Sequence, residues 1–445
     1  MTGKPALVWF RLDLRLADNG ALLKALEAHP AIVPVFIWEP GEESPWPPGA
    51  ASRWWLHYSL LALESALARR GSRLIVRRGP TGEALRAVAS ETGATAIYWN
   101  RRYEPAVIAR DSDIKRRLNE SGLAAESLPG NLLWEPWNLR NSSGKPFQVF
   151  TAFWRACQAM PAPPAPTLAP KRIPAPARWP PSLAIAGLDL LPTIDWAGGL
   201  RETWRPGEAS ATARLQTFLE EGVASYPVDR DRPDRRGTSR LSPHLHFGEI
   251  SARQIWHAAG AARNSDAFLR QIAWREFAHH LLFHFPNTPK EPMRPEFRAF
   301  PWRFDAKALE AWTRGRTGYP LVDAGMRELW HTGWMHNRVR MVVASFLVKH
   351  LLVPWQEGAA WFWDTLVDAD LANNTLGWQW VAGCGADAAP YFRIFNPALQ
   401  ADKFDPAGEY RRRWIQESRY PPPIVDHAAA RQRALAALAR IKNTQ

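Results

Sequence analysis

The sequence predicts a two-domain protein in which an α/β domain with a doubly wound parallel sheet precedes an all-helical domain. Three observations predict this fold. Short apolar runs alternate with helical patterns up to about residue 130, proline clusters follow between residues 160 and 192, and amphipathic helical patterns fill the chain from about residue 200. With 445 residues, the chain also exceeds what one hydrophobic core usually organises.

The α/β domain is predicted from its apolar runs. Buried strands are expected at residues 6–10, 32–38, 73–77 and 95–99, with helices at 54–69 and 82–92. Strands and helices that alternate at this spacing are typical of a parallel sheet. No glycine-rich dinucleotide fingerprint follows the first strand, because Phe10-Arg11-Leu12-Asp13-Leu14-Arg15 stands in its place. The edge of this sheet is therefore open to a different ligand.

The helical domain is predicted from amphipathic patterns at 209–221, 252–262, 267–285, 321–331, 335–352 and 359–371, and from a basic helix at 428–441. Proline clusters such as Pro161-Ala162-Pro163-Pro164 disfavour helix and strand alike. We therefore expect an α/β domain over residues 1–130, a proline-rich linker over 131–200 and a helical domain over 201–445.

The charge balance indicates a polyanionic partner. Lys and Arg number 56 against 43 Asp and Glu, and the net charge of +13 favours nucleic acid, with a basic surface kept for solubility as the alternative. Only two cysteines occur, too few for a disulfide framework, a four-thiolate zinc site or an iron–sulfur cluster, and we expect no metal. With no signal peptide and no run long enough to cross a membrane, we expect a cytoplasmic monomer.

Tryptophan is unusually frequent, with 24 residues against 8 tyrosines. Most of these indoles must pack in the core, because each buries a large area. A basic chain rich in indole also suits the stacking of nucleic-acid bases or of an aromatic cofactor.

Polar residues recur at positions where a helix face or a turn would suit a ligand. The run Gly237-Thr238-Ser239-Arg240-Leu241-Ser242-Pro243 sets hydroxyls ahead of a helix, which suits phosphate oxygens or simply a capped turn. One helix face is shared by Gln271, Trp274, Arg275 and Ala278, and another by Asn337, Arg340 and Met341. Such faces imply either an internal polar network or a ligand.

A third face comprises Asp370, Asn374 and Trp378, which are four residues apart in turn. Pairing of Arg340 with Asp368 would satisfy both charges, and a plain structural salt bridge is equally allowed.

These motifs resemble the photolyase/cryptochrome family over essentially the whole chain. They are Thr-Ser-Arg-Leu-Ser at 238–242, Trp-Arg-Glu-Phe at 274–277, Thr-Gly-Tyr-Pro-Leu-Val-Asp-Ala at 317–324, Gly-Trp-Met-His-Asn-Arg at 333–338, Asp-Ala-Asp-Leu-Ala-Asn-Asn at 368–374, Gly-Trp-Gln-Trp at 377–380 and Tyr-Phe-Arg-Ile-Phe-Asn-Pro at 391–397. The stretches 314–317 and 362–366 are most similar to the bacterial dimer photolyases nearest to plant cryptochromes.

The resemblance implies that the helical domain binds FAD. The matching FAD residues are Tyr226, Thr238, Ser239, Arg240, Leu241, Ser242, Arg340, Asp368, Ala369, Asp370 and Asn374. Asn374 matches the residue that faces flavin N5, where plant cryptochromes place an acid. An amide there favours a flavin kept reduced and competent for repair, whereas a buried Asn bonded only to backbone is the alternative.

The resemblance also implies a pocket for a flipped-out pyrimidine dimer in UV-damaged DNA. Trp274 matches its aromatic wall, and the other matching lesion or DNA contacts are Arg230, Gln271, Arg275, Ala278, Asn337, Arg338, Met341 and Gln400. Gln271 is a departure, because many dimer photolyases have Glu at this position. The amide keeps hydrogen bonding but loses any charge or proton, which affects the expected repair efficiency.

Trp302, Trp355 and Trp378 match the family's electron-hopping chain, through which a photo-oxidised flavin regains electrons, whereas Trp380 is expected to be structural. An antenna chromophore is expected in the α/β domain, where Trp38, Glu39 and Glu104 lie at a position that suits a pterin folate such as methenyltetrahydrofolate, with deazaflavin as the other option.

The expected function is light-driven repair of cyclobutane pyrimidine dimers by electron transfer from reduced FAD, which makes the chain a deoxyribodipyrimidine photo-lyase. The alternative is a cryptochrome photoreceptor, which Trp274, Asn374 and the lack of a long C-terminal tail disfavour. A (6-4) photolyase is a weaker reading, because that branch has a His pair where this chain has His336-Asn337.

Overall fold

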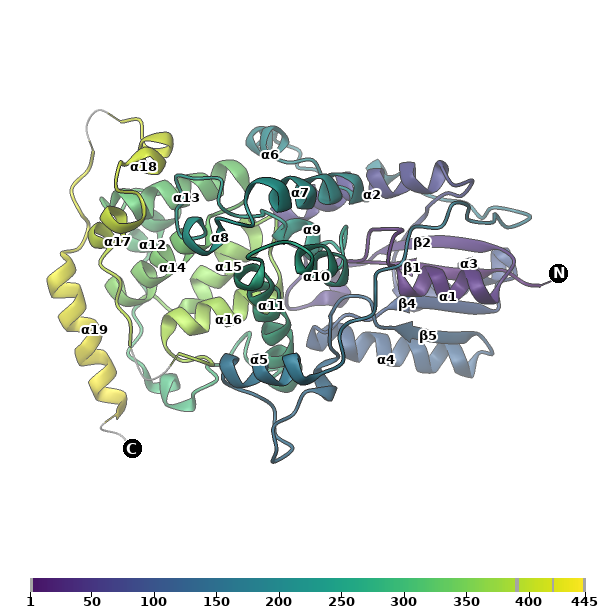
Figure 1. Ribbon diagram of the computed structural model, residues 1–445, viewed down its shortest axis with the longest axis horizontal. Helices are drawn as coiled ribbons and strands as arrows, with labels where there is room; N and C mark the ends of the chain where they lie inside the picture. Colours follow the sequence, from purple (N-terminus) through teal and green to yellow (C-terminus); the bar gives the residue numbers. More distant parts are fainter. Residues whose placement is uncertain (1–2, 389–391, 418–419, 443–445) are drawn as a thin grey trace.

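The computed structural model describes residues 3–388, 392–417 and 420–442. Tyr391, the first residue of one family motif, lies outside this described part. Figure 1 shows an elongated molecule, with a sheet domain at the N-terminal end and a larger group of helices at the other. No helix in the described ranges is long and apolar enough to cross a membrane.

The N-terminal domain is built on five parallel strands in the order β3-β2-β1-β4-β5. The strands are β1 (Ala6–Phe10), β2 (Ile32–Trp38), β3 (Ile75–Arg78), β4 (Ala96–Asn100) and β5 (Ala124–Leu128). Alternate residues of β1 pack into the hydrophobic cores on opposite faces of the sheet. Leu7 and Trp9 pack toward α3 (Thr81–Thr92) and α4 (Pro105–Glu120), whereas Val8 and Phe10 pack toward α1 (Gly20–Ala28) and α2 (Ala50–Ala68). The predicted doubly wound sheet is therefore confirmed.

Two strands differ from the expectation. The third begins at Ile75 rather than Arg73, and β5 was not predicted. β5 is an edge strand with the sequence Ala-Ala-Glu-Ser-Leu, and most of its side chains are exposed or half-buried. An edge strand needs little apolar sequence, so it lacks the hydrophobic signal of the central strands.

The segment expected to be a linker has an irregular part that lies on the α/β domain and a helix that packs on the helical domain. Residues 161–184 form no helix or strand and run over the α/β domain, where the carbonyl of Pro174 accepts the N–H of Ile32 at 2.9 Å and Leu183 donates to the carbonyl of Val76 at 3.0 Å. Before it, α5 (Phe150–Ala159) is a regular helix that packs on α11 (Asp266–His284) of the helical domain. Short 3-10 turns at Pro136–Asn138 and Ile185–Leu188 complete the segment.

The remaining chain is helical, and no strand occurs among its described residues beyond 200, as predicted. Its elements are α6 (Gly198–Thr203), α7 (Glu208–Glu221), α8 (Tyr226–Asp229), α9 (Ser242–His246), α10 (Ala252–Gly260), α11 (Asp266–His284), α12 (Ala306–Thr313), α13 (Pro320–Thr332), α14 (Asn337–Ser345), α15 (Trp355–Thr365), α16 (Leu371–Ala382), α17 (Pro397–Phe404), α18 (Glu409–Trp414) and α19 (His427–Lys442). A 3-10 turn covers Pro295–Ala299, and a π-helical turn, Phe346–His350, extends α14.

The helix expected over 359–371 is interrupted. α15 ends at Thr365, and Val367 instead donates its N–H to the carbonyl of Gly333 at 2.8 Å. α16 then begins anew at Leu371, because the Asp370 side chain accepts the N–H of Asn373 at 2.8 Å and caps it.

The two domains are interlocked by polar contacts. Glu208 accepts the backbone N–H of Leu16 at 2.9 Å and that of the next residue at 2.8 Å. Arg253 donates from Nε to the buried Asp18 at 3.0 Å. Gly248 has φ of +62°, and a Cβ there would lie 2.2 Å from the carbonyl oxygen of Leu12. A glycine is therefore required where the two backbones meet.

Candidate active site

Several predicted site residues lie on α16 or on helices that pack against it. α11, which carries Gln271 and Trp274, packs along α16, and α14 and α15 contact it from other sides. Figure 1 shows these helices grouped in the middle of the helical domain. The elements predicted to hold FAD and lesion are thus neighbours in the fold.

Asn374 is held in one orientation. Its Nδ2 donates to the carbonyl oxygen of Ala359 on α15 at 3.0 Å, and its Oδ1 receives no hydrogen bond from the described residues. The side chain is half-buried, so an acceptor oxygen is presented from α16. Asp370 lies one turn before it, near the imidazoles of His279 and His246 at 3.5 and 3.7 Å. Burial alone would raise the pKa of Asp370, but the two histidines outweigh burial and hold it well below its ordinary value.

The predicted pairing of Arg340 with Asp368 is confirmed. Arg340 Nη2 lies 2.8 Å from Asp368 Oδ2 and 3.1 Å from Oδ1, while its Nε donates to the carbonyl of Met335 at 2.8 Å. The carboxylate is nearly fully buried, so the bidentate contact compensates a charge that would otherwise be costly to bury. Ala369, between the two acidic residues, is also buried.

The turn at 237–242 is tightly built. Gly237 approaches Asp229 so closely that a Cβ would lie 2.5 Å from it. Arg240 has φ of +52°, and its guanidinium lies 4.8 Å from the ring of Trp204 and 4.6 Å from that of Trp334. Burial lowers the pKa of Arg240, and Glu328 partly opposes this. Ser242 Oγ accepts from Trp334 Nε1 at 3.3 Å, which ties the turn to the loop before α14.

The polar groups of this turn leave donors for a ligand. Arg240 Nε is buried without an acceptor, and the half-buried Thr238 makes no hydrogen bond within the described residues. Ser239 is half-buried and Leu241 is buried in the core. Tyr226 is buried against Phe218 and Phe268.

The predicted lesion residues divide into those whose side chains remain available to a ligand and those that contact neighbouring segments of the protein. Gln271, Trp274 and Met341 are half-buried, Asn337 is exposed at the start of α14, and Gln400 is half-buried on α17. The Gln271 amide makes no hydrogen bond within the described residues, so it remains available to a ligand. Arg230 is half-buried at the end of α8, and its guanidinium lies 5.6 Å from the Tyr226 ring.

Three of the predicted lesion contacts have contacts within the protein. Arg275 donates to the Asn131 carbonyl at 3.0 Å and to Glu276 at 3.0 Å, so its charge is used within the protein. Ala278 is 1% exposed and packs in the core between α11 and α16. Arg338 pairs with Asp231 at 2.8 Å. Arg275 and Ala278 lie on α11 and Arg338 lies on α14, and each also contacts a neighbouring segment.

The three predicted chain tryptophans share one core cluster. Trp355 and Trp378 are buried and Trp302 is half-buried at its edge. Trp378 lies so close to Gly358 that a Cβ on this glycine would meet its ring at 2.1 Å. The rings of Trp302 and Phe300 are tilted by 46° with centroids 4.4 Å apart, and Arg303 donates its N–H to the carbonyl of Leu352, just before α15. The arrangement runs from the buried interior toward the surface.

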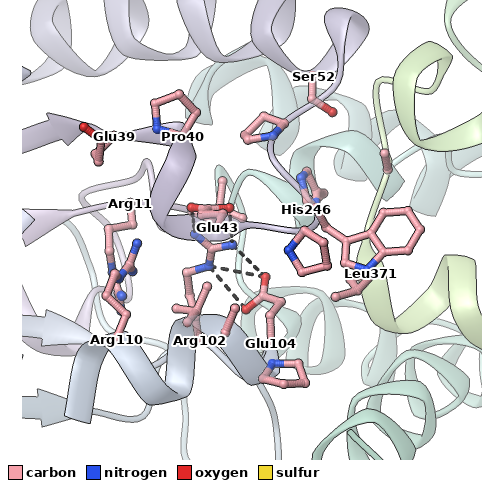
Figure 2. Close-up of a pocket in the computed structure, with 18 of the residues that line it drawn as sticks. Arg11, Glu39, Pro40, Glu43, Ser52, Arg102, Glu104, Arg110, His246 and Leu371 are labelled. Atoms are coloured by element: carbon pink, nitrogen blue, oxygen red, sulfur yellow. Dashed lines mark hydrogen bonds and ion pairs between the residues drawn. The ribbon is translucent and has the colours of Figure 1, made fainter. Parts of the chain in front are cut away.

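A cavity of about 270 Å³ lies between the two domains (Figure 2). Its lining includes Trp38, Glu39 and Glu104, the three residues predicted for an antenna site. Arg102 is clamped between Glu43 at 2.6 Å and Glu104 at 2.8 Å, as Figure 2 shows. Burial alone would raise the pKa of Glu104, but Arg102 outweighs burial and lowers it to about 2.

Four indoles line this cavity, those of Trp9, Trp38, Trp46 and Trp363. Trp46, from the loop before α2, meets Trp363 of α15 at 5.6 Å with an edge-on angle of 71°. The N–H groups of Trp9 and Trp46 are buried without an acceptor in the described part of the chain. A site with unpaired donors and aromatic walls suits a planar, polar-edged ligand.

Comparisons with known proteins identify the family. Residues 6–171 match the family model described as DNA photolyase, and residues 268–419 match the one described as the FAD binding domain of DNA photolyase. The chain is 48% identical to the deoxyribodipyrimidine photo-lyase of Agrobacterium fabrum, over 99% of this chain and 98% of that protein. The chain belongs to the DNA photolyase family.

Other relatives of this photolyase-family chain agree. The crystal structure of a bacterial class III photolyase from Agrobacterium tumefaciens has a TM-score of 0.95 and 46% identity, and the match covers 100% of this chain and 98% of that one. Cryptochrome-1 of Arabidopsis thaliana is 42% identical over 96% of this chain but only 65% of its own length. The predicted resemblance to bacterial photolyases near plant cryptochromes is confirmed, as are the fold class and the FAD-binding domain.

One relevant residue escaped sequence reasoning. Phe150 of α5 stacks on Trp274 with ring centroids 3.8 Å apart and planes 7° apart. α5 lies in the segment expected to be a linker. The spacing of Phe150, Phe153 and Cys157, all buried, is the helical signal that marks it as part of the core.

Proposed function

We propose that this chain is a deoxyribodipyrimidine photo-lyase that repairs cyclobutane pyrimidine dimers in UV-damaged DNA under blue light. The observation that carries the proposal is the 48% identity to a photo-lyase over 99% of this chain and 98% of that protein, against 42% identity to plant cryptochrome-1. The half-buried Trp274 and the amide Asn374 support repair rather than signalling.

The DNA-binding face is assigned to residues that remain available in the structure. Arg230 supplies a phosphate contact, which positions the duplex without reading the lesion. Trp274 forms the aromatic wall for the extruded dimer, and the Gln271 amide, which has no hydrogen-bond partner among the described residues, hydrogen-bonds its edge. Asn337, Met341 and Gln400 complete the set. The net charge of +13 strengthens binding through release of counterions.

FAD fits the polar groups around α16. The turn at 238–242 and Arg240 hold the phosphates, and Asp368, Asp370 and Arg340 line the flavin side. When bound, reduced FAD supplies one light-driven electron that opens the two cyclobutane bonds and then returns, so the reaction is redox-neutral overall. The protein contributes position and exclusion of water.

Asn374 sets the hydrogen bonding at flavin N5. Because Nδ2 is tied to the carbonyl of Ala359, the group left for the flavin is the acceptor Oδ1. An amide oxygen accepts a hydrogen bond from N5–H but cannot donate a proton. Asn374 therefore favours the reduced flavin, in which N5 carries hydrogen.

Electrons reach the flavin site through Trp302, Trp355 and Trp378. Trp302 is half-buried and the other two are buried, so Trp302 is placed at the outer end, where it can exchange electrons with solvent reductants. The buried core around the inner two excludes water from the path.

The interdomain cavity is assigned to the antenna, and methenyltetrahydrofolate is the favoured occupant. Aromatic walls suit its conjugated rings, and Glu39, whose carboxylate meets no cation in the described residues, suits an aminopyrimidine edge. Lys290, on the helical-domain side, suits a glutamate tail. Deazaflavin is the other outcome of the test.

The experiment is direct. The absorption and fluorescence spectra of the purified protein should show a flavin together with a second near-ultraviolet chromophore, which acid extraction and mass spectrometry identify. Blue light should then restore dimer-containing oligonucleotides to intact pyrimidines. Flavin without any repair, under reducing conditions, would favour the cryptochrome alternative.

A further inference from the structure

The indole of Trp274 has one covered face. Phe150 lies parallel to it at 3.8 Å, and Phe277 meets its edge at 5.7 Å with an angle of 75°. Phe150 is 1% exposed, whereas Trp274 is half-buried. Of the two stacked rings, that of Trp274 is the more exposed, and Phe150 covers one of its faces.

Phe150 is itself held by α11. The guanidinium of Arg270 lies 5.3 Å from its ring, and Phe277 meets it edge-on at 5.8 Å. Arg270, Trp274 and Phe277 follow the i, i+4, i+7 spacing, so they form one stripe of α11. The first residue of α5 therefore rests in the middle of that stripe.

We propose that Phe150 is a positioning residue for lesion recognition, the fixed inner layer of a three-layer stack formed by Phe150, Trp274 and the extruded dimer. This proposal rests on the proposed function of Trp274. Phe150 stacks on the indole of Trp274 and holds its plane before DNA binds. Binding therefore does not include the entropy cost of ordering the Trp274 side chain. The segment containing α5 thereby belongs to the lesion pocket.

The chain offers a matched control in Phe153, one turn later on α5. It is also fully buried and contacts Phe277 at 5.1 Å, but no ring contact joins it to Trp274. Phe150→Leu and Phe153→Leu thus remove an aromatic ring from the same helix and the same core cluster. Phe150→Tyr keeps the stack and should rescue function.

The experiment measures Kd for dimer-containing and undamaged oligonucleotides, together with repair yield per bound dimer, on flavin-loaded protein. Phe150→Leu should weaken dimer binding about 2- to 10-fold and leave undamaged DNA unchanged, as ordering of one large side chain implies. Phe153→Leu and Phe150→Tyr should keep the wild-type ratio of the two Kd values. Should Phe150→Leu not accumulate in folded form, Phe150→Met takes its place.

Equal ratios for Phe150→Leu and Phe153→Leu would overturn the inference and reduce Phe150 to a core residue. Trp274→Ala separates this failure from that of the proposed pocket. If Trp274→Ala loses discrimination while Phe150→Leu keeps it, the pocket stands and the inference falls. If Trp274→Ala keeps discrimination, both fall.

Discussion

Glu276 couples the stability of this protein to pH. It lies 2% exposed in the Trp-Arg-Glu-Phe motif, where one oxygen accepts the N–H of Leu133 at 2.7 Å and the other faces Arg275 at 3.0 Å. Burial raises its pKa from 4.5 to about 7, against the opposing effect of Arg275. Between these two values, the folded protein retains a proton that the unfolded chain has released.

Stability must therefore fall as the pH rises through this window. A raised carboxyl pKa contributes most below the unfolded value near 4.5, and the contribution is lost once the pH passes about 7. The shift corresponds to about 3 kcal/mol, most of which is lost between pH 5 and pH 8. For 445 residues, that is a change in Tm of about 3 °C.

Glu276→Gln removes the titration but keeps a carbonyl acceptor for Leu133. The Tm of wild type and variant is followed by thermal unfolding between pH 5 and pH 8. The difference in Tm between wild type and variant should change by about 3 °C across this range, because the Tm of the wild type falls relative to that of the variant as the pH rises. Two parallel curves would refute the reasoning, because Glu276 would then have the same pKa in both states.

Four further predictions concern function. Trp378→Phe should abolish photoreduction of oxidised flavin while chemically reduced enzyme still repairs dimers, and unimpaired photoreduction would move the electron path elsewhere. Asn374→Asp should place a proton donor at N5 and alter the flavin spectrum during illumination, so an unchanged spectrum would exclude this role. Arg230→Ala should weaken binding to damaged and undamaged DNA alike and lower the slope of log K against log salt concentration by about 1. A loss of affinity for damaged DNA alone would contradict a phosphate contact. Trp46→Ala should release the antenna and remove its near-ultraviolet absorption while flavin content stays the same, and retention of that absorption would place the antenna outside the cavity.

The sequence predicted the features that follow from periodicity. The central strands and the helical domain were foreseen because their apolar residues recur at a regular period, and the Arg340–Asp368 pair because a buried charge needs a partner. The direction of a side chain at the border of a helix face is set by neighbours that are distant in sequence. Arg275 turns to Asn131, 144 positions away, and no local pattern contains that partner. The same reason hid the contact between Phe150 and Trp274.

The family models leave a gap between residues 171 and 268, and several polar contacts between the domains are made by residues in this gap. Glu208, Gly248 and Arg253 all fall in this gap, and each meets the loop that follows β1. The gap is therefore not a spacer that tolerates exchange. A chimera that combined the sheet of one family member with the helices of another would have to match both sides of these contacts. The two regions that the family models match separately could therefore be exchanged between family members only together.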